Sequence, residues 1–264
     1  MNREKNIGLV FSGGGSRGSF QIGVWQALID MGLDTSIGAV YGTSVGAING
    51  AAFVQNNIQL ALDIWQNLNY SKVFADLPEE RPSVSNRRLF YEWMKGSIRK
   101  RGLDVSPLKE VIRLGIDEEK IRSSDLDYGL VVFDLTNRKS KYLTISQIPE
   151  GQLTEYIIAS ATLPVFQAHR IEDSLYLDGG IVDNRPLSFL NGKKHIDKVI
   201  VVDVTMARHV WPSKRVKGNV EMYYVRPSRL LGSPLAFKED RIISNLELGY
   251  QDARKQLAHL RVRR

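Results

Sequence analysis

The chain has 264 residues, of which 43% are hydrophobic and 25% are charged, and its formal net charge is +7. This is ordinary globular composition, which excludes disordered, collagen-like and low-complexity proteins. The absence of cysteine excludes disulfides, thiolate nucleophiles and iron–sulfur clusters, and it fits a reducing compartment. We therefore expect a cytoplasmic protein, whose basic charge permits an anionic partner such as a phospholipid surface or a nucleic acid.

Apolar runs that favour strands alternate with helical patterns along the chain, which is typical of an α/β layered domain. The expected strands are residues 7–11, 37–41, 128–135, 141–146, 175–177, 198–204 and 220–225. The expected helices are residues 20–31, 47–54, 153–161 and 240–260. Because no repeat or linker-like segment divides the sequence, the simplest prediction is a single domain over residues 1–264.

Residues 35–62 carry no charged side chain, and their glycines recur at every fourth position, from Gly38 to Gly50. Small residues at this spacing are typical of packed membrane helices. However, polar residues interrupt the stretch, and its apolar blocks are far shorter than the about 20 residues that span a bilayer. We therefore expect a buried strand, a turn and a helix here, with membrane contact that is at most peripheral.

A glycine-rich loop between the first expected strand and helix contains Gly13, Gly14, Gly15 and Gly18. Consecutive glycines tolerate positive φ angles, so such a loop can direct several backbone N–H groups at one point. The helix that follows adds its positive N-terminal end. The loop therefore suits a phosphate or a transient oxyanion, although a turn needed only for close packing is an alternative.

Nucleotide binding is a second interpretation of the same loop. The glycine spacing matches the dinucleotide fingerprint, which also requires an acidic residue at the end of the next strand. Here Asp34 precedes that strand, and the strand ends in Tyr41. The P-loop requires a lysine where this chain has Ser19. A nucleotide-binding protein is therefore the less favoured interpretation.

Ser44 lies in the pattern Gly42-x-Ser44-x-Gly46, between an expected strand and an expected helix. The serine of a nucleophile elbow stands on a sharp strand-to-helix turn, so this context gives the short motif its meaning. Bulky residues at positions 42 and 46 would collide across such a turn. Ser44 is therefore a candidate nucleophile.

A serine hydroxyl needs a positioned base to become a good nucleophile. None of the four histidines follows a turn that suggests a catalytic loop; they are His169, His195, His209 and His259. Asp178 is a better candidate, because it lies where a short apolar strand ends in Gly179 and Gly180. The alternative is a plain Asp-Gly turn.

Together, these elements resemble the patatin-like phospholipase family. That family has a G-G-G-x-R-G loop, here Gly13 to Gly18 with Arg17, a G-x-S-x-G elbow, here around Ser44, and an acid in D-G-G or D-G-A, here Asp178. A fourth block, a Ser/Ala-rich helix end followed by proline, resembles residues 159–164. The resemblance covers about residues 7–190 in family order.

The resemblance implies a three-layer α/β fold with a central, mostly parallel sheet flanked by helices. It implies that Ser44 and Asp178 form a dyad without histidine, with the oxyanion held by N–H groups at 13–15 in a loop that Arg17 and Gly18 shape. The substrate would be a lipid acyl ester, with no cofactor and no metal. An acyltransferase, in which a lipid alcohol replaces water, would use the same dyad.

Residues 71–105 contain an apolar helical face within basic surroundings. That face consists of Leu89, Phe90, Trp93, Met94 and Ile98. It suits an amphipathic lid or a membrane-surface segment, or a helix packed on the core. The lipid-ester interpretation favours an anionic bilayer over nucleic acid as the partner, since no nucleic-acid-binding module is recognisable. Residues 191–264 carry no motif with a recognisable function.

Overall fold

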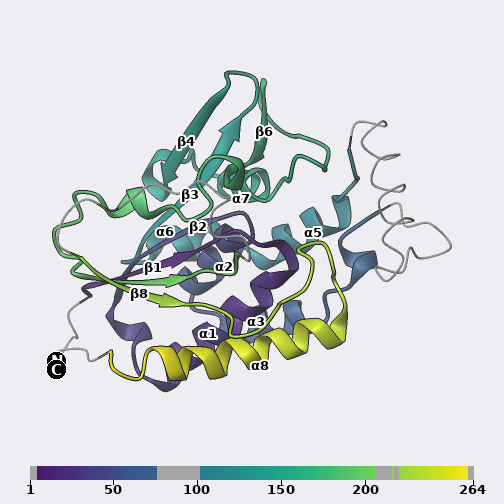
Figure 1. Ribbon diagram of the computed structural model, residues 1–264. Coiled ribbons are helices and arrows are strands. Elements are labelled where there is room, and N and C mark those ends of the chain that lie inside the picture. The colour runs from purple at the N-terminus through teal and green to yellow at the C-terminus, as the bar shows by residue number, and fades with distance from the viewer. Residues whose placement is uncertain (1–4, 76–101, 206–215, 217–219, 261–264) are drawn as a thin grey trace.

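The computed structural model describes residues 5–75, 102–205, 216 and 220–260. Its central sheet has the strand order β5-β6-β3-β2-β1-β7-β8, with β4 pairing beside β3 (Figure 1). The strands are β1 (Ile7–Phe11), β2 (Ile37–Thr43), β3 (Asp127–Asp134), β4 (Lys139–Thr144), β5 (His169–Ile171), β6 (Ser174–Asp178), β7 (Lys198–Val202) and β8 (Glu221–Val225). The neighbouring strands β3, β2, β1, β7 and β8 pair in parallel. The strands β4, β5 and β6 pair antiparallel with their neighbours.

Helices cover one face of this sheet. They are α1 (Gly18–Asp30), α2 (Val45–Val54), α3 (Ile58–Gln66), α5 (Ser106–Gly115), α6 (Glu118–Ser123), α7 (Leu153–Ser160) and α8 (Glu239–Gln256). In Figure 1, α1, α3 and α8 lie along the same side of the sheet. The 3-10 helix Leu187–Leu190 covers part of the other face, so the predicted three-layer α/β fold with a mostly parallel central sheet is confirmed.

Alternate residues of the central strands divide the core in two. Leu9, Val40 and Ile200 belong to the larger cluster with the helices. Tyr41 faces the other way, where its ring stacks on Phe189 at 4.7 Å between centroids, under the segment Leu187–Leu190. Burial on both faces explains why these strands are almost continuously apolar.

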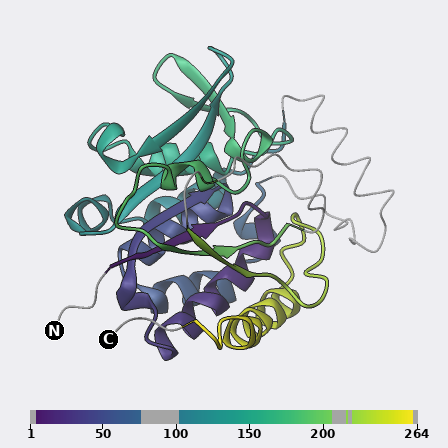
Figure 2. The same cartoon turned by 60° about the vertical axis from the view of Figure 1, so that its left-hand side comes forward.

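Helix α8 packs along α1 (Figure 2). A Cβ atom at Gly23 would collide with the Leu246 carbonyl, and one at Gly249 would collide with the Phe20 carbonyl. The two glycines therefore allow the helix backbones to approach closely. This crossing attaches the C-terminal part of the chain to the helix that follows the glycine-rich loop.

The uncharged stretch 35–62 forms β2, α2 and the first part of α3. Among the described residues, no helix is long and apolar enough to cross a bilayer. The expected strands and helices are all present. The strand at residues 7–11 has the expected ends, and each of the others differs at one or both ends. The sequence analysis did not predict β5, α3, α5 and α6. The apolar face proposed as a lid falls on residues 76–101, which lie outside the described residues.

The order of β1 and β2 in the sheet positions the site. These parallel neighbours point the same way, so their carboxyl ends meet at one edge. The glycine-rich loop follows β1 and Ser44 follows β2. This edge is where open α/β sheets place their ligands.

Candidate active site

Ser44 occupies a strained turn between β2 and α2. Its φ of 59° and ψ of −131° lie in a region that residues with a Cβ atom rarely adopt. A Cβ atom at Gly42 would collide with the Gly46 carbonyl, and one at Gly46 would collide with the Phe11 carbonyl. The glycines of the G-x-S-x-G pattern are therefore required by a close backbone approach around Ser44.

The Ser/Ala-rich block holds this turn in place. The Ser44 N–H donates to Ser160 Oγ at 3.1 Å, and Ser160 Oγ donates in turn to the Val131 carbonyl at 2.7 Å. Two residues further on, the Thr162 carbonyl accepts the N–H of Asp178 at 2.7 Å. One segment thus fixes the backbone of both the candidate nucleophile and the candidate acid.

Asp178 ends β6 with its side chain buried, only 1% exposed. Its Oδ1 accepts the Gly180 N–H at 2.6 Å. Burial raises the pKa of the carboxyl to about 7, against the smaller, opposite effects of the Ser44 hydroxyl and the Gly180 N–H. Asp178 Oδ2 has no hydrogen-bond partner among the described residues, although the Ser44 hydroxyl lowers the pKa of this carboxyl. Asp178 is therefore a buried carboxyl near Ser44 whose pKa lies close to neutral pH.

The glycine-rich loop lies beside Ser44. A Cβ atom at Gly13 would be 3.0 Å from Ser44 Cβ, and the Gly13 N–H already donates to the Asn184 carbonyl at 3.1 Å. The N–H groups of Gly14 and Gly15 have no acceptor within the described parts of the chain. Of the three amides expected to face an oxyanion, only these two are therefore available.

Arg17 and Gly18 shape the loop from its far side. Arg17 Nε donates to the Gly232 carbonyl at 2.8 Å, and burial lowers the pKa of its guanidinium. The neighbouring Ser16 N–H donates to the Pro234 carbonyl at 2.8 Å. A Cβ atom at Gly18 would collide with Val45, at the start of α2. The C-terminal segment therefore holds the loop against the elbow.

A buried chain of amide groups supports the loop from beneath. Trp65 Nε1 donates to Asn49 Oδ1 at 3.0 Å, and Asn49 Nδ2 donates to Gln21 Oε1 at 2.8 Å and to the Gly18 carbonyl at 3.0 Å. Gln21 Nε2 then donates to the Ser12 carbonyl at 2.7 Å. Buried polar groups that are fully paired hold a local structure rigidly.

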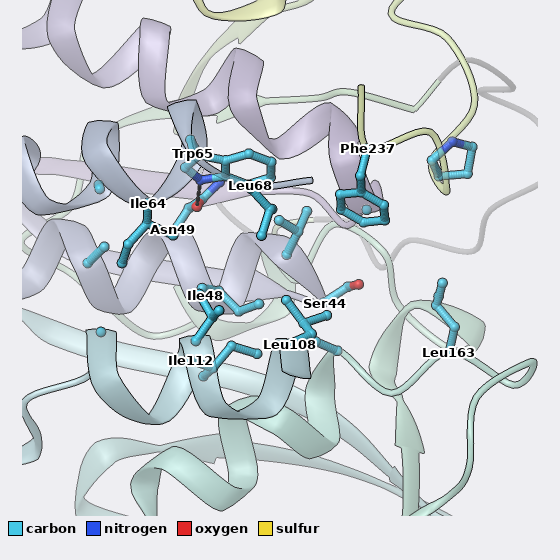
Figure 3. Close-up of a pocket in the computed structure, with 18 of the residues that line it drawn as sticks. Ser44, Ile48, Asn49, Ile64, Trp65, Leu68, Leu108, Ile112, Leu163 and Phe237 are labelled. Atoms are coloured by element: carbon cyan, nitrogen blue, oxygen red, sulfur yellow. Dashed lines mark hydrogen bonds between the residues drawn. The ribbon is translucent and has the colours of Figure 1, made fainter. Parts of the chain in front are cut away.

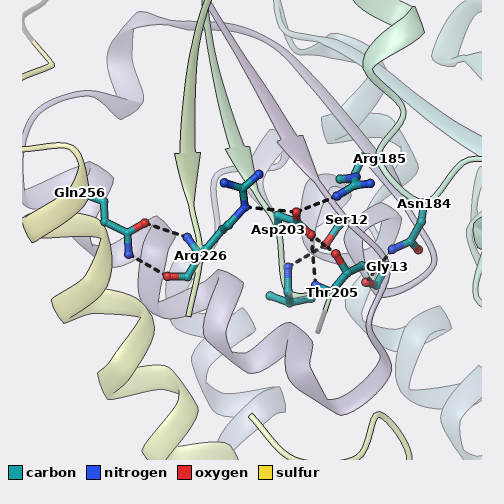
Figure 4. Close-up of polar contacts among 9 residues, drawn as sticks. Ser12, Gly13, Asn184, Arg185, Asp203, Thr205, Arg226 and Gln256 are labelled. Carbon is teal, nitrogen blue, oxygen red and sulfur yellow. Dashed lines mark hydrogen bonds and ion pairs between the residues drawn. The ribbon is translucent and has the colours of Figure 1, made fainter. Parts of the chain in front are cut away.

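A second polar cluster fixes the loop from the side of β7 (Figure 4). The buried carboxylate of Asp203 accepts from Arg185 Nη1 at 2.9 Å and from Arg226 Nε at 3.5 Å. Next to it, the Val204 N–H donates to Ser12 Oγ at 2.9 Å. The segment that follows Asp178 is thereby tied to the end of β7 and to the start of the loop.

A narrow apolar pocket of about 90 Å³ extends from Ser44 between α2, α3 and α5. In Figure 3, Ile48, Ile64 and Ile112 lie on one side of Ser44, and Leu163 lies on the other. The remaining lining residues are Gly15, Val45, Asn49, Ala52, Ala61, Trp65, Leu68, Leu108, Val111, Gly115, Ile116, Ala161, Leu163, Phe166, Pro234, Leu235 and Phe237. A hydroxyl at the end of an apolar pocket suits an ester whose acyl part is a hydrocarbon chain.

Residues 9–190 match the family model for patatin-like phospholipases. The chain belongs to the patatin-like phospholipase family. It is 27% identical over 214 residues to a lysophospholipase of Aspergillus terreus, an alignment that covers 76% of this chain and 12% of that protein. It is 26% identical over 215 residues to an uncharacterized NTE family protein of Mycobacterium tuberculosis. That alignment covers 81% of this chain and 53% of that protein. The chain thus spans between about an eighth and about half of these relatives.

Two solved structures share the fold of this patatin-like chain. VipD from Legionella pneumophila superposes with a TM-score of 0.55 at 15% identity, covering 97% of this chain and 67% of that one. The type III effector protein ExoU superposes with a TM-score of 0.53 at 13% identity, covering 97% and 53%. At these identities the likeness concerns the fold alone.

No histidine of the described part of this patatin-like chain lines the pocket. His169 Nε2 is 2.8 Å from Glu155 Oε2, and burial, with Lys109 nearby, lowers the pKa of its imidazole. His195 and His259 are exposed, and His209 lies outside the described residues. The Asp178 carboxyl, by contrast, has its pKa affected by the Ser44 hydroxyl.

Three parts of the pocket were not identified from the sequence. The segment with Pro234, Leu235 and Phe237 has no periodic pattern, so nothing local indicated its place beside Ser44. Helices α3 and α5, by contrast, carry apolar residues at i, i+3 and i+4, starting at Ala61 and Leu108. That spacing was a usable signal for two helices with one apolar face.

Proposed function

We propose that the chain is a serine acyl hydrolase that cleaves lipid esters, such as phospholipids or lysophospholipids, through a Ser44–Asp178 dyad. The observation that carries the proposal is the contact of Ser44 with a buried carboxyl whose pKa is about 7, at the end of an apolar pocket. An exposed aspartate, with a pKa of about 3.9, is too weak a base for this step. A carboxyl that titrates near neutral pH can accept and return a proton.

In the acylation step, Ser44 Oγ attacks the ester carbonyl carbon while Asp178 accepts the hydroxyl proton. The carbonyl oxygen becomes an oxyanion, which accepts hydrogen bonds from the N–H groups of Gly14 and Gly15. The start of α2 directly after Ser44 adds the positive end of its dipole. Loss of one such donor costs about 2.7–4 kcal/mol of barrier in comparable enzymes, so the loop should matter nearly as much as Ser44.

Asp178 then returns its proton to the departing alcohol, which leaves an acyl group on Ser44. In deacylation, water attacks the acyl carbon and gives its proton to Asp178, and the tetrahedral intermediate collapses to release the fatty acid. Ser44 regains its proton from Asp178. During both steps the hydrocarbon chain lies in the pocket, where each buried methylene contributes about 0.8 kcal/mol of binding.

Fluorophosphonate labelling tests the nucleophile. We expect the wild-type protein to be labelled and to release fatty acid from a panel of phospholipids, lysophospholipids and simple esters, and Ser44→Ala to do neither. Ser146→Ala, in which an exposed serine outside the pocket is changed, is the matched control and should behave as the wild type. Labelling that persists in Ser44→Ala, or its absence from the wild type, would contradict the dyad.

The same assay separates hydrolysis from acyl transfer. With a monoacylglycerol added as acceptor, a hydrolase continues to release free fatty acid. An acyltransferase would instead form diacylglycerol at the expense of the free acid. We expect fatty acid to remain the main product.

The net charge of +7 supports contact with an anionic bilayer as the source of substrate. Two leucines are strongly exposed, Leu114 at 85% and Leu230 at 74%. Co-sedimentation with liposomes tests this contact: binding should rise with the fraction of anionic lipid and fall with added salt. Binding that is indifferent to both would contradict it.

A further inference from the structure

Distances along the pocket can be measured on α2, because residues of this helix line the pocket at regular intervals. Ser44, Ile48 and Ala52 follow one another along α2 at a spacing of four residues, and all three face the pocket. With a rise of 1.5 Å per residue, Ala52 lies about 12 Å beyond Ser44 along the helix axis. The level of Ala52 therefore marks the deep end of the wall that α2 contributes.

Helices α3 and α5, which form the other two walls of the pocket, come together near the level of Ala52. A Cβ atom at Gly115 on α5 would lie 3.0 Å from Ile64 Cδ1 on α3, so the two helices nearly touch there. Gln55 ties the end of α2 to the same place, because its Nε2 donates to the Gly115 carbonyl at 2.8 Å and its Oε1 accepts the Asp117 N–H at 3.1 Å. All three helices thus meet near the C-terminal end of α2.

The one amide side chain along the pocket offers nothing to a polar ligand. Asn49 uses its Oδ1 for Trp65 and its Nδ2 for Gly18 and Gln21. All other side chains between Ser44 and the deep end are hydrocarbon or aromatic. An unsubstituted alkyl chain is the ligand that this interior accepts without leaving a polar group unpaired.

We propose that Ala52, Ile64 and Gly115 set the upper length of the acyl chain that this site accepts. The inference rests on the proposed function and deepens it. A C–C bond of about 1.5 Å in a zigzag chain advances about 1.3 Å per methylene, so about 12 Å holds about nine carbons. An acyl chain longer than this would meet the contact between Ile64 and Gly115.

The test uses p-nitrophenyl butyrate, decanoate and palmitate as substrates below their solubility limits. For the wild type we expect kcat/KM to be highest for decanoate. Ala52→Leu fills the deep end, so it should lower the decanoate-to-butyrate ratio of kcat/KM about tenfold or more, the effect of a few misfitting methylenes. Ile64→Ala opens the contact with Gly115 and should raise the palmitate-to-decanoate ratio by a similar factor.

Leu62→Ala is the matched control, because Leu62 lies on the same helix as Ile64, packs on the core and does not line the pocket. Its chain-length profile should match that of the wild type. A ratio unchanged in both Ala52→Leu and Ile64→Ala, or a wild-type preference for palmitate, would overturn the proposal. Failure of the proposed function itself would appear differently, as a lack of Ser44-dependent turnover of butyrate.

Discussion

Asn184 is bonded to Gly13 twice: its carbonyl accepts the Gly13 N–H at 3.1 Å, and its Nδ2 donates to the Gly13 carbonyl at 3.3 Å. Its Oδ1 would lie only 2.3 Å from a Cβ atom at Gly13 and 2.9 Å from one at Gly180. Gly13 lies beside Ser44, and the Gly180 N–H donates to Asp178 Oδ1. Asn184 therefore couples the glycine-rich loop to the turn that carries the acid.

We predict that Asn184→Ala lowers kcat about ten- to a hundredfold with a smaller change in KM, which is less than the loss from removing an oxyanion donor. The reason is that the loop loses its side-chain attachment while the pocket walls stay intact. The loss of a buried hydrogen-bonding group should also cost about 1–3 kcal/mol of unfolding free energy. Steady-state kinetics on one short and one medium-length ester measure the separate effects on kcat and KM.

Asn67→Ala serves as the control for this variant, because Asn67 is exposed and its amide bonds only to its own helix end. It should leave both kinetic constants unchanged. If Asn184→Ala raised KM and left kcat intact, Asn184 would be a residue of the pocket wall rather than one that positions the loop.

A second prediction concerns the pH dependence of activity. Because the Asp178 carboxyl has a pKa of about 7 and must be ionised to accept the Ser44 proton, kcat/KM should rise with pH and level off above about pH 8. A pH–rate profile for a neutral ester gives the midpoint directly. A midpoint near 4, typical of an exposed carboxyl, would show that burial does not tune this group.

Whereas activity should rise with pH, the stability of the folded protein should fall as pH rises. Since the folded-state pKa of Asp178 is raised above that of an unfolded aspartate, the folded protein binds more protons between about pH 4 and pH 7. The free energy of unfolding therefore falls as pH rises through that window, and the ionised carboxyl is destabilising above it. Asp178→Asn should remove this effect, and so raise the unfolding temperature at pH 8 while abolishing turnover.

Thermal melts at pH 5 and pH 8 test this expectation. The difference in unfolding temperature between Asp178→Asn and the wild type should be larger at pH 8. Asp173→Asn, which changes an exposed aspartate in the turn before β6, is the control and should show no such difference. Equal shifts at both pH values would mean that the charge of Asp178 is not destabilising in the folded protein.

Most of the fold and the central residues of the site were predictable from the sequence because their signals are local. Ser44 and the glycine-rich loop each follow a continuous apolar strand, and adjacent parallel strands bring their ends together. Asp178 was found from its place at the end of a short strand. The surroundings that bury Asp178 and raise its pKa come from segments distant in the sequence.

The supporting contacts were not predictable, since each joins residues far apart in the chain. Ser160 acts on Ser44 across 116 positions, and Asn184 acts on Gly13 across 171. Asn49 and Gln21 occupy ordinary helical positions, and only the packing of α1 against α2 makes them partners. Side chains of these types are common on helices, so the sequence carries no sign of their pairing.

The final prediction concerns Arg17, which the family resemblance places in the oxyanion loop. In the structure its Nε donates to the Gly232 carbonyl, close to the segment with Pro234 and Leu235 that lines the pocket. We predict that Arg17→Ala raises KM for medium-length esters more than it lowers kcat for a short ester. The reason is that the pocket segment with Pro234 and Leu235 loses its attachment to the loop. Arg17→Lys should not fully restore the wild-type values, since an ammonium cannot reproduce the fixed guanidinium geometry. Arg170→Ala, which removes an exposed arginine, is the control and should leave kcat and KM for these esters unchanged. If Arg17→Ala instead lowered kcat equally on all esters, Arg17 would act on the oxyanion itself.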